Sequence, residues 1–184
     1  MPKDRKIDWI ILGLLAHEDM TGYDIKKRVD HEISFFWKGS FGSIYPALNE
    51  MLKAGQIEKT EEEPCGGREK ILYHITGQGK ETLKRWLMDS RADNDLKYET
   101  LVKIFFGRSA GREASIRNIE IFEGKVRDDL AMLKFFQNNL EKVLKEEDHF
   151  YYYLTVLFGI ETYEAYLRWC EKAKKMLLEC TNSY

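Results

Sequence analysis

One stretch decides the fold of this chain, and it reads GSFGSIYPAL over residues 39–48. Small, hydroxyl and aromatic residues here lead into a predicted helix over residues 43–54, which stops at Gly55, a residue type that commonly ends helices. The apolar face of this helix, which seats it on a core, comprises Ile44, Ala47, Leu48, Met51 and Leu52. The opposite side begins with small, hydrogen-bonding residues, so it can approach another backbone closely. A DNA groove is one such surface.

The segments after this helix predict a hairpin. Residues 56–61 alternate weakly, as a short strand does, and residues 69–75 form a second strand candidate. The intervening residues 62–68 contain one proline and two glycines, which are typical of a turn. A further helix is expected over residues 76–88. The order helix, hairpin, helix is that of a winged helix, the helix-turn-helix variant with a β-wing.

Two shorter helices are expected before the deciding stretch. Apolar residues recur at helical spacing over residues 7–17 and predict a first helix. A second helix is expected over residues 22–30, with Asp19 or Thr21 as its N-cap. We interpret Trp37, in the aromatic connection that follows, as a hydrophobic anchor for the next helix rather than a ligand contact.

Three motifs stand in order along this part of the chain: Thr21-Gly22-Tyr23-Asp24-Ile25, Ser40-x-Gly42-Ser43-Ile44-Tyr45-Pro46-x-Leu48 and Tyr73-x-Ile75-Thr76-x-x-Gly79. Together they resemble the PadR family of bacterial transcriptional regulators, over roughly residues 7–90. The rest of the chain is similar, more loosely, to the helical C-terminal region of the longer family members. The resemblance implies a mainly α fold with a small β-hairpin, in which an N-terminal winged helix-turn-helix precedes a C-terminal helical dimerisation region.

The resemblance also implies DNA binding by the helix that begins near Ser43. We expect groove or phosphate contacts from three residues of this helix and backbone contacts from one tyrosine and two wing residues. These candidates are Ser43, Tyr45 and Asn49, and Tyr23, Arg68 and Lys70. Asn49 is of a residue type that reads adenine. The wing departs from the family pattern, because residues 61–63 are acidic and Glu69 interrupts its two cations.

Similar proteins act most often as repressors, and some bind aromatic or drug-like molecules near a dimer interface. The resemblance therefore implies a homodimeric repressor that binds double-stranded DNA at a pseudo-palindromic operator and is released by a small aromatic effector. A protein of another class remains as the alternative, namely a winged-helix protein–protein adaptor or a small-molecule-binding scaffold with incidental DNA affinity. The near-neutral charge and the abundance of aromatic residues favour this alternative.

A charged segment over residues 90–95 interrupts the pattern and marks a domain boundary. We expect a winged-helix DNA-binding domain over residues 1–90 and a helical dimerisation domain over residues 91–184. In the second domain, a helix over residues 114–145 carries an apolar heptad series. The series comprises Ile119, Val126, Leu133 and Leu140. We assign it to dimerisation, with a bundle formed within one chain as the alternative interpretation.

Composition and charge limit the classes of protein to which the chain can belong. The 184 residues are 43% hydrophobic and 33% charged, as in a folded, helix-rich protein. No apolar run of about 18 residues predicts a membrane span, and the N-terminus lacks a signal-peptide pattern, so we expect a cytoplasmic protein. The net charge is −2, and residues 1–90 carry 14 cationic against 15 anionic side chains. DNA binding therefore depends on local cationic clusters, for which residues 26–28 and the wing pair are candidates.

No catalytic, cofactor or metal site is expected. The four histidines are scattered, and no glycine-rich nucleotide motif lies between a strand and a helix. The three cysteines, Cys65, Cys170 and Cys180, lack metal-binding spacing and are expected to be reduced thiols. Cys65 falls in the predicted wing turn, where a redox-sensing role is the alternative to an incidental thiol.

Overall fold

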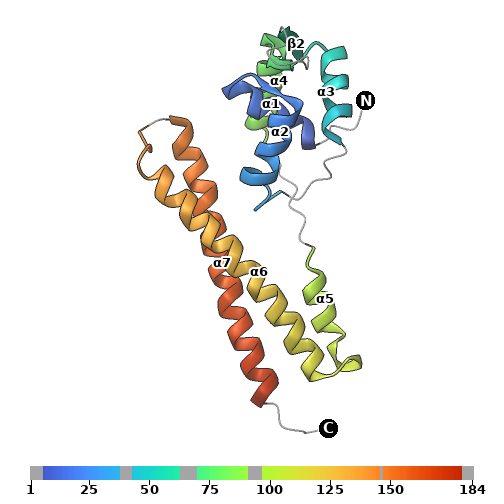
Figure 1. The fold of residues 1–184 in the computed structure, drawn as a ribbon, viewed down its shortest axis with the longest axis vertical. Coiled ribbons are helices and arrows are strands. Elements are labelled where there is room, and N and C mark those ends of the chain that lie inside the picture. Colours follow the sequence, from blue (N-terminus) through green and yellow to red (C-terminus); the bar gives the residue numbers. More distant parts are fainter. Residues whose placement is uncertain (1–5, 38–42, 63–69, 91–96, 146, 180–184) are drawn as a thin grey trace. The chain divides into compact units, whose positions relative to one another are not determined.

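The computed structural model describes residues 6–37, 43–62, 70–90, 97–145 and 147–179. The chain divides into two compact units, Met1–Asn94 and Asp95–Tyr184 (Figure 1). Each unit has its own set of buried apolar side chains. The fold is mainly helical with one small antiparallel sheet, which confirms the predicted fold class.

The N-terminal unit has the element order of a winged helix. Its elements are α1 (Lys6–His17), β1 (Met20–Thr21), α2 (Gly22–Arg28), η1 (Val29–Ile33), α3 (Ile44–Lys53), β2 (Ile57–Glu62), β3 (Lys70–Ile75) and α4 (Gly77–Met88). The helices and the two wing strands begin and end within a few residues of the predicted positions. η1 is a single π-helical segment that continues α2, where an ordinary helix end was expected.

The sheet contains one strand more than the predicted hairpin. β2 and β3 pair antiparallel from Ile57 opposite Ile75 to Glu62 opposite Lys70. β1 pairs with the other edge of β3, with Met20 opposite Tyr73. A two-residue strand has no measurable alternation, so its pairing could not be read from the sequence pattern. It ties the start of α2 to the base of the wing.

The core of the N-terminal unit lies where α1, α2, α3 and the sheet meet. Its most completely buried side chains are Ile11, Leu12, Ile25, Ile44, Leu48, Met51 and Ile57. Trp9 of α1 stacks on Trp86 of α4, with ring centroids 5.3 Å apart and planes 4° from parallel. Both tryptophans are therefore accounted for by packing between helices, as expected for aromatic residues.

The C-terminal unit is formed by helices. It contains α5 (Glu99–Phe105), a short 3-10 segment (Gly107–Ser109), α6 (Arg112–Leu140) and α7 (Glu147–Glu179). α6 and α7 run antiparallel and side by side along most of their length (Figure 1). α6 ends at Leu140, five residues before the predicted end, and a turn follows it. In the part of the chain that the structure describes, no helix has the length and apolar character needed to cross a membrane.

The heptad series of α6 lies in the seam with α7. Ile119, Val126 and Leu133 are buried within the single chain, and Leu140 is partly buried. Leu133 lies against Gly159 of α7, where an added Cβ would come within 2.9 Å of its Cδ1 atom. α7 of the same chain therefore covers this series. Burial of the series within one chain neither requires nor excludes a second subunit, so its assignment to dimerisation stays a prediction.

One charged side chain, Glu123, is buried in the same seam. It accepts a hydrogen bond from Lys174 of α7 and another, 2.7 Å long, from Arg127 on its own helix. The Lys174 and Arg127 hydrogen bonds lower the pKa of the Glu123 carboxyl below its usual range. Because the folded-state pKa is depressed, this network stabilises the fold above the unfolded pKa. Its contribution is lost as the pH falls through the folded-state value.

The junction between the wing and α4 has no room for a side chain at Gly79. A Cβ there would lie 2.1 Å from the carbonyl oxygen of Gln56 and 2.7 Å from Cγ1 of Ile75. Thr76 fixes the junction, because its hydroxyl donates to the carbonyl of Gly55 at 2.7 Å and accepts from the Gly79 N–H at 3.1 Å. The glycine in the third motif therefore permits a close approach between backbones.

We predict that Gly79→Ala destabilises the protein by about 1–3 kcal/mol, since a backbone oxygen blocks the new methyl group. Gly77→Ala, two residues earlier in the same helix, is the matched control. Nothing lies within 4 Å of a Cβ at Gly77, so this change should stabilise the helix slightly, by at most about 1 kcal/mol. Chemical denaturation measures both. Equal effects of the two substitutions would contradict the packing described here.

Candidate nucleic-acid interface

α3 presents one face to the core and the other to solvent. Ile44, Ala47, Leu48 and Met51 are fully buried against the rest of the N-terminal unit. Tyr45, Pro46, Asn49, Glu50 and Lys53 are exposed on the opposite face. Ten residues are too few for a stable isolated helix, so burial of the inner face holds the outer face in position. The predicted assignment of Leu48 to the inside and Asn49 to the outside agrees with this geometry.

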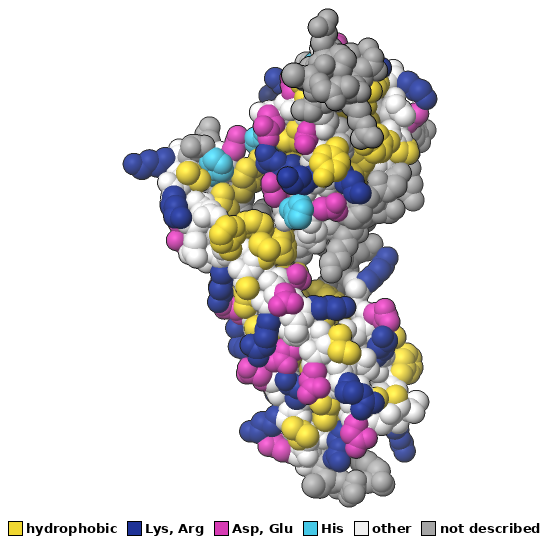
Figure 2. Space-filling view, viewed as in Figure 1, with side chains coloured by type: hydrophobic (Ala, Val, Ile, Leu, Met, Phe, Trp, Pro, Cys, Tyr) yellow, Lys and Arg dark blue, Asp and Glu magenta, His cyan; other side chains and the backbone are white. Residues whose placement is uncertain are grey.

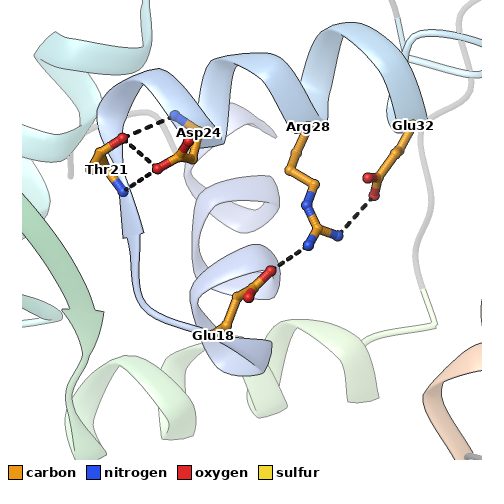
Figure 3. A network of polar contacts seen from close by, with 5 residues as sticks. All are labelled: Glu18, Thr21, Asp24, Arg28 and Glu32. Carbon is orange, nitrogen blue, oxygen red and sulfur yellow. Dashed lines mark hydrogen bonds and ion pairs between the residues drawn. The ribbon is translucent and has the colours of Figure 1, made fainter.

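The start of α2 is fixed by a capping box at Thr21. The Thr21 hydroxyl accepts from the Asp24 N–H at 3.1 Å, and the Thr21 N–H donates to the Asp24 carboxylate at 3.3 Å (Figure 3). Of the two predicted caps, Thr21 is therefore the N-cap. This arrangement orients Tyr23, whose side chain is 69% exposed at the first turn of α2.

Tyr45 of α3 lies over the same helix start. A Cβ at Gly22 would lie 2.8 Å from Cε1 and 3.2 Å from Cζ of the Tyr45 ring. The ring can occupy this place because residue 22 is a glycine. Tyr45 nevertheless remains 56% exposed. The structure thus brings two of the predicted site residues, Tyr23 and Tyr45, to adjoining positions at the junction of α2 and α3.

Ser43 and Asn49 occupy different parts of α3. Ser43 directly precedes the helix and is partly buried, and its side chain makes no capping hydrogen bond to the helix. Asn49 is exposed six positions further along the helix. Next to it, Lys53 forms an ion pair with Glu50, with Nζ and Oε1 2.8 Å apart. Neither of these charged residues was among the predicted site residues, although their spacing of three on an exposed helix face is a recognisable signal.

The wing candidates are described only in part. Arg68 and the wing cysteine Cys65 lie outside the described residues, and Lys70 is the first residue of β3. Further along the wing, His74 and Glu58 face each other across the two strands, with Nε2 and Oε2 3.2 Å apart.

The cationic run over residues 26–28 divides into two parts. The Arg28 guanidinium contacts the carboxylates of both Glu18 and Glu32, the latter at 3.2 Å (Figure 3). It thereby joins the end of α1 to η1, and its charge is offset by two anions. Lys26 and Lys27 are exposed on α2. Phosphate binding by this run stays a prediction, for which the two exposed lysines are better placed than the paired arginine.

The helical unit retains large exposed apolar side chains. Four lie in or next to α5, namely Leu101, Val102, Phe105 and Phe106. Others lie on the outer sides of α6 and α7, namely Ile121, Met132, Phe135, Phe150, Tyr151, Leu154 and Phe158. Figure 2 shows apolar side chains reaching the surface on one side of this unit. Phe105 is 82% exposed although its ring contacts that of Phe106, and phenylalanine side chains are seldom this exposed.

An aromatic cluster fills the inside of the helical unit between α5, α6 and α7. Phe122 contacts the rings of Tyr98, Tyr166 and Trp169 at centroid distances of 5.8–6.2 Å. The hydroxyls of Tyr98 and Tyr166 share a hydrogen bond, and burial raises the pKa of Tyr98, with the hydrogen bond as the second cause. These aromatic residues pack on one another.

The described residues contain neither a thiol suited to covalent chemistry nor a cluster suited to metal binding. Burial raises the pKa of the Cys170 thiol, which is fully enclosed, so it is poorly suited to react as a thiolate. Within the described ranges, no group of three or more His, Cys, Asp or Glu side chains could hold a metal ion.

Known proteins match both parts of the chain. Residues 11–85 match the model of the "Transcriptional regulator PadR-like family", and residues 96–177 match that of the "Virulence activator alpha C-term" region. The negative transcriptional regulator PadR of Bacillus subtilis is 26% identical over 181 residues, which is 94% of this chain and 98% of that protein.

Solved structures have the same fold. The crystal structure of Bacillus subtilis PadR with operator DNA is 27% identical, has a TM-score of 0.79, and covers 94% of this chain and 99% of that one. The same protein with p-coumaric acid has a TM-score of 0.72 at 27% identity, covering 95% and 100%. The Vibrio cholerae virulence activator AphA, at 21% identity and a TM-score of 0.74, covers 96% and 100% and shares the fold.

The two family models follow one another along the chain, at residues 11–85 and 96–177. This is the order that the sequence motifs predicted, with the winged-helix part before the helical part. The full-length relative and the structural matches extend over both units of the fold. By these matches the chain is a transcriptional regulator of the PadR type and not an enzyme: residues 11–85 match the model of the PadR-like family, and the similarity to PadR extends through the helical C-terminal unit.

Proposed function

We propose that this regulator binds double-stranded operator DNA as a homodimer and represses transcription. Residues 1–90 serve as the DNA-binding domain and residues 91–184 as the dimerisation domain. The main observation behind the proposal is that α3 has one fully buried face and one exposed face. Packing of the buried face against the core directs the exposed face to solvent. The operator complex of Bacillus subtilis PadR, a protein that matches 94% of this chain, supports binding to operator DNA.

In this proposal α3 enters the major groove, and the wing lies against the backbone or the minor groove. Ser43, Tyr45 and Asn49 contact the groove or nearby phosphates. Tyr23, Arg68 and Lys70 contact the backbone. Tyr23 and Tyr45 occupy adjoining positions and are both exposed, which supports contact of the two phenol groups with one DNA strand. Asn49 is suited to the N6 and N7 edge of adenine.

A homodimer matches a pseudo-palindromic operator, because a two-fold axis repeats α3 at both half-sites. The exposed apolar side chains around α5 supply the surface that a second copy would cover. For regulation we propose release from DNA by a small aromatic effector, which the p-coumaric acid complex of Bacillus subtilis PadR supports.

Footprinting on the DNA upstream of the protein's own gene tests the proposal directly. We expect a protected pseudo-palindrome, binding that weakens steeply with salt, and much weaker binding to random DNA of equal length. Adding phenolic acids to the same reaction tests effector release. Binding that is equally weak on both DNAs would instead favour the protein–protein adaptor.

Folding and DNA contact can be separated within α3. We predict that Leu48→Ala costs about 2–5 kcal/mol of stability, because Leu48 is completely buried, and that it weakens DNA binding only through unfolding. Asn49→Ala should leave the melting temperature nearly unchanged. If Asn49 meets a base edge, its loss should relax preference at one operator position by about 1–3 kcal/mol. Thermal melting and competition binding measure the two effects. A reversed pattern of stability would show that the helix faces are misassigned.

The wing should contribute affinity without sequence preference. We predict that Arg68→Ala with Lys70→Ala weakens binding about equally for all sequences, because phosphate contacts position the protein without specifying bases. The slope of log affinity against log salt should fall by up to about 0.9 per lost contact. Arg117→Ala with Lys172→Ala, at exposed sites of the helical unit, is the control of equal charge. An unchanged slope in the wing variant would remove the wing from the DNA interface.

Dimerisation should depend on the exposed apolar surface of α5. We predict that Phe105→Glu shifts the protein from dimer to monomer at micromolar concentration, because it places a charge in an apolar interface, while the melting curve stays cooperative. Leu87→Glu, at a comparably exposed leucine of the N-terminal unit, should leave the dimer intact. Sedimentation velocity measures both. A monomeric wild type would refute the homodimer, and a dimeric Phe105→Glu variant would exclude α5 from its interface.

A further inference from the structure

The exposed face of α3 carries a carboxylate that the proposed DNA contacts do not use. Glu50 and Lys53 are the charged residues of α3, and they form an ion pair with side chains 58% and 74% exposed. The helix therefore brings no net charge to the DNA and releases few counterions. An anion on a surface that faces phosphates costs binding energy unless it meets a hydrogen-bond donor there. Such donors lie on the base edges of the major groove.

Glu50 is directed to the same side of the helix as Asn49. At about 100° per residue, Asn49, Lys53 and Glu50 fall within an arc of about 100° on the outward side. The buried residues Ala47, Leu48 and Met51 occupy the opposite side. If Asn49 meets a base edge, as proposed above, Glu50 and Lys53 lie beside it over neighbouring base pairs.

The chemistry of the pair matches one particular base pair. In the major groove, a C·G pair presents the N4 amino donor of cytosine beside the O6 and N7 acceptors of guanine. A carboxylate accepts from the first, and an ammonium donates to the second. We propose that the Glu50–Lys53 pair reads one C·G base pair in each half-site, with Glu50 on cytosine N4 and Lys53 on guanine O6 or N7. This proposal rests on DNA binding by α3.

Specificity arises mainly from rejection of the other bases. Thymine O4, guanine O6 and purine N7 are acceptors, and each of them repels a carboxylate placed at the cytosine position. Adenine offers an amino donor, but N7 lies next to it. The ion pair shows that the two side chains can lie side by side, with Nζ and Oε1 2.8 Å apart, as the adjacent groups of one base pair require. Glu50 is thus a specificity-determining residue that contributes little to affinity for phosphates.

Selection of binding sites from random DNA tests the proposal. Wild type, Glu50→Ala, Glu50→Gln and Lys53→Met are each selected, and dissociation constants are then measured for operators with single base-pair changes at one salt concentration. Glu81→Gln, at an exposed glutamate of α4, controls for the loss of one negative charge. Thermal melting controls for folding, which these exposed substitutions should not alter.

For the wild type and the Glu81→Gln control we expect the same C·G preference at one position of each half-site. Glu50→Ala and Lys53→Met should each relax that one position about tenfold and leave the others unchanged. Glu50→Gln should shift it towards A·T, because glutamine pairs with the adenine edge.

Two results would overturn the proposal. In the first, the Glu50 variants bind all sequences more tightly and by the same factor, so that Glu50 only repels phosphates. In the second, Glu50 and Lys53 affect different positions, so that they do not read one base pair together. A wild type that selects no sequence at all would overturn DNA recognition itself, and with it this assignment. The wild-type selection therefore separates that failure from the other two.

Discussion

Burial of the inner face of α3 is the constraint on which the proposed interface depends. The helix is too short to persist alone, so its position is set by the contacts of Ile44, Leu48 and Met51 with the core. The same burial fixes the outward direction of Asn49 and Glu50. A core substitution here would therefore lower the stability of the protein and also displace the outward side chains, such as Asn49, that we propose to contact DNA. Substitutions on the outer face should alter recognition alone, which makes the two properties separable by experiment.

Much of the fold could be predicted because its signals are local. Helical periodicity, the alternation of the two wing strands and the capping residue Thr21 each act over a few positions, and the structure contains the helices and strands that they predicted. Features that depend on distant partners were missed. β1 is defined only by its pairing with β3, and Arg28 is engaged by Glu18, ten residues before it. From sequence alone Arg28 resembles any cation in a basic run, and its charge is offset only once α1 and α2 are packed.

The heptad series of α6 illustrates a different limit. An antiparallel helix pair within one chain and a coiled coil between two chains bury the same seam positions, so periodicity cannot distinguish them. In this structure α7 occupies the seam, and Glu123 pairs with Lys174 inside it. The assignment of this series to dimerisation stays a prediction, and the interface that we propose between subunits uses exposed residues outside it. Exposed phenylalanines such as Phe105 were not distinguished by the pattern, because α5 is too short to show a clear period.

The charge distribution sets the balance between affinity and specificity. With 14 cationic and 15 anionic side chains in residues 1–90, and with Arg28 already paired, few cations remain for phosphates. In the proposed interface we therefore expect counterion release to supply less affinity than in a strongly basic DNA-binding protein, and binding to random DNA to be correspondingly weak. Contacts to base edges would consequently account for a larger share of operator affinity. In such an interface a glutamate on the outward face of α3 is consistent with recognition, because rejection of wrong bases adds specificity without strengthening non-specific binding.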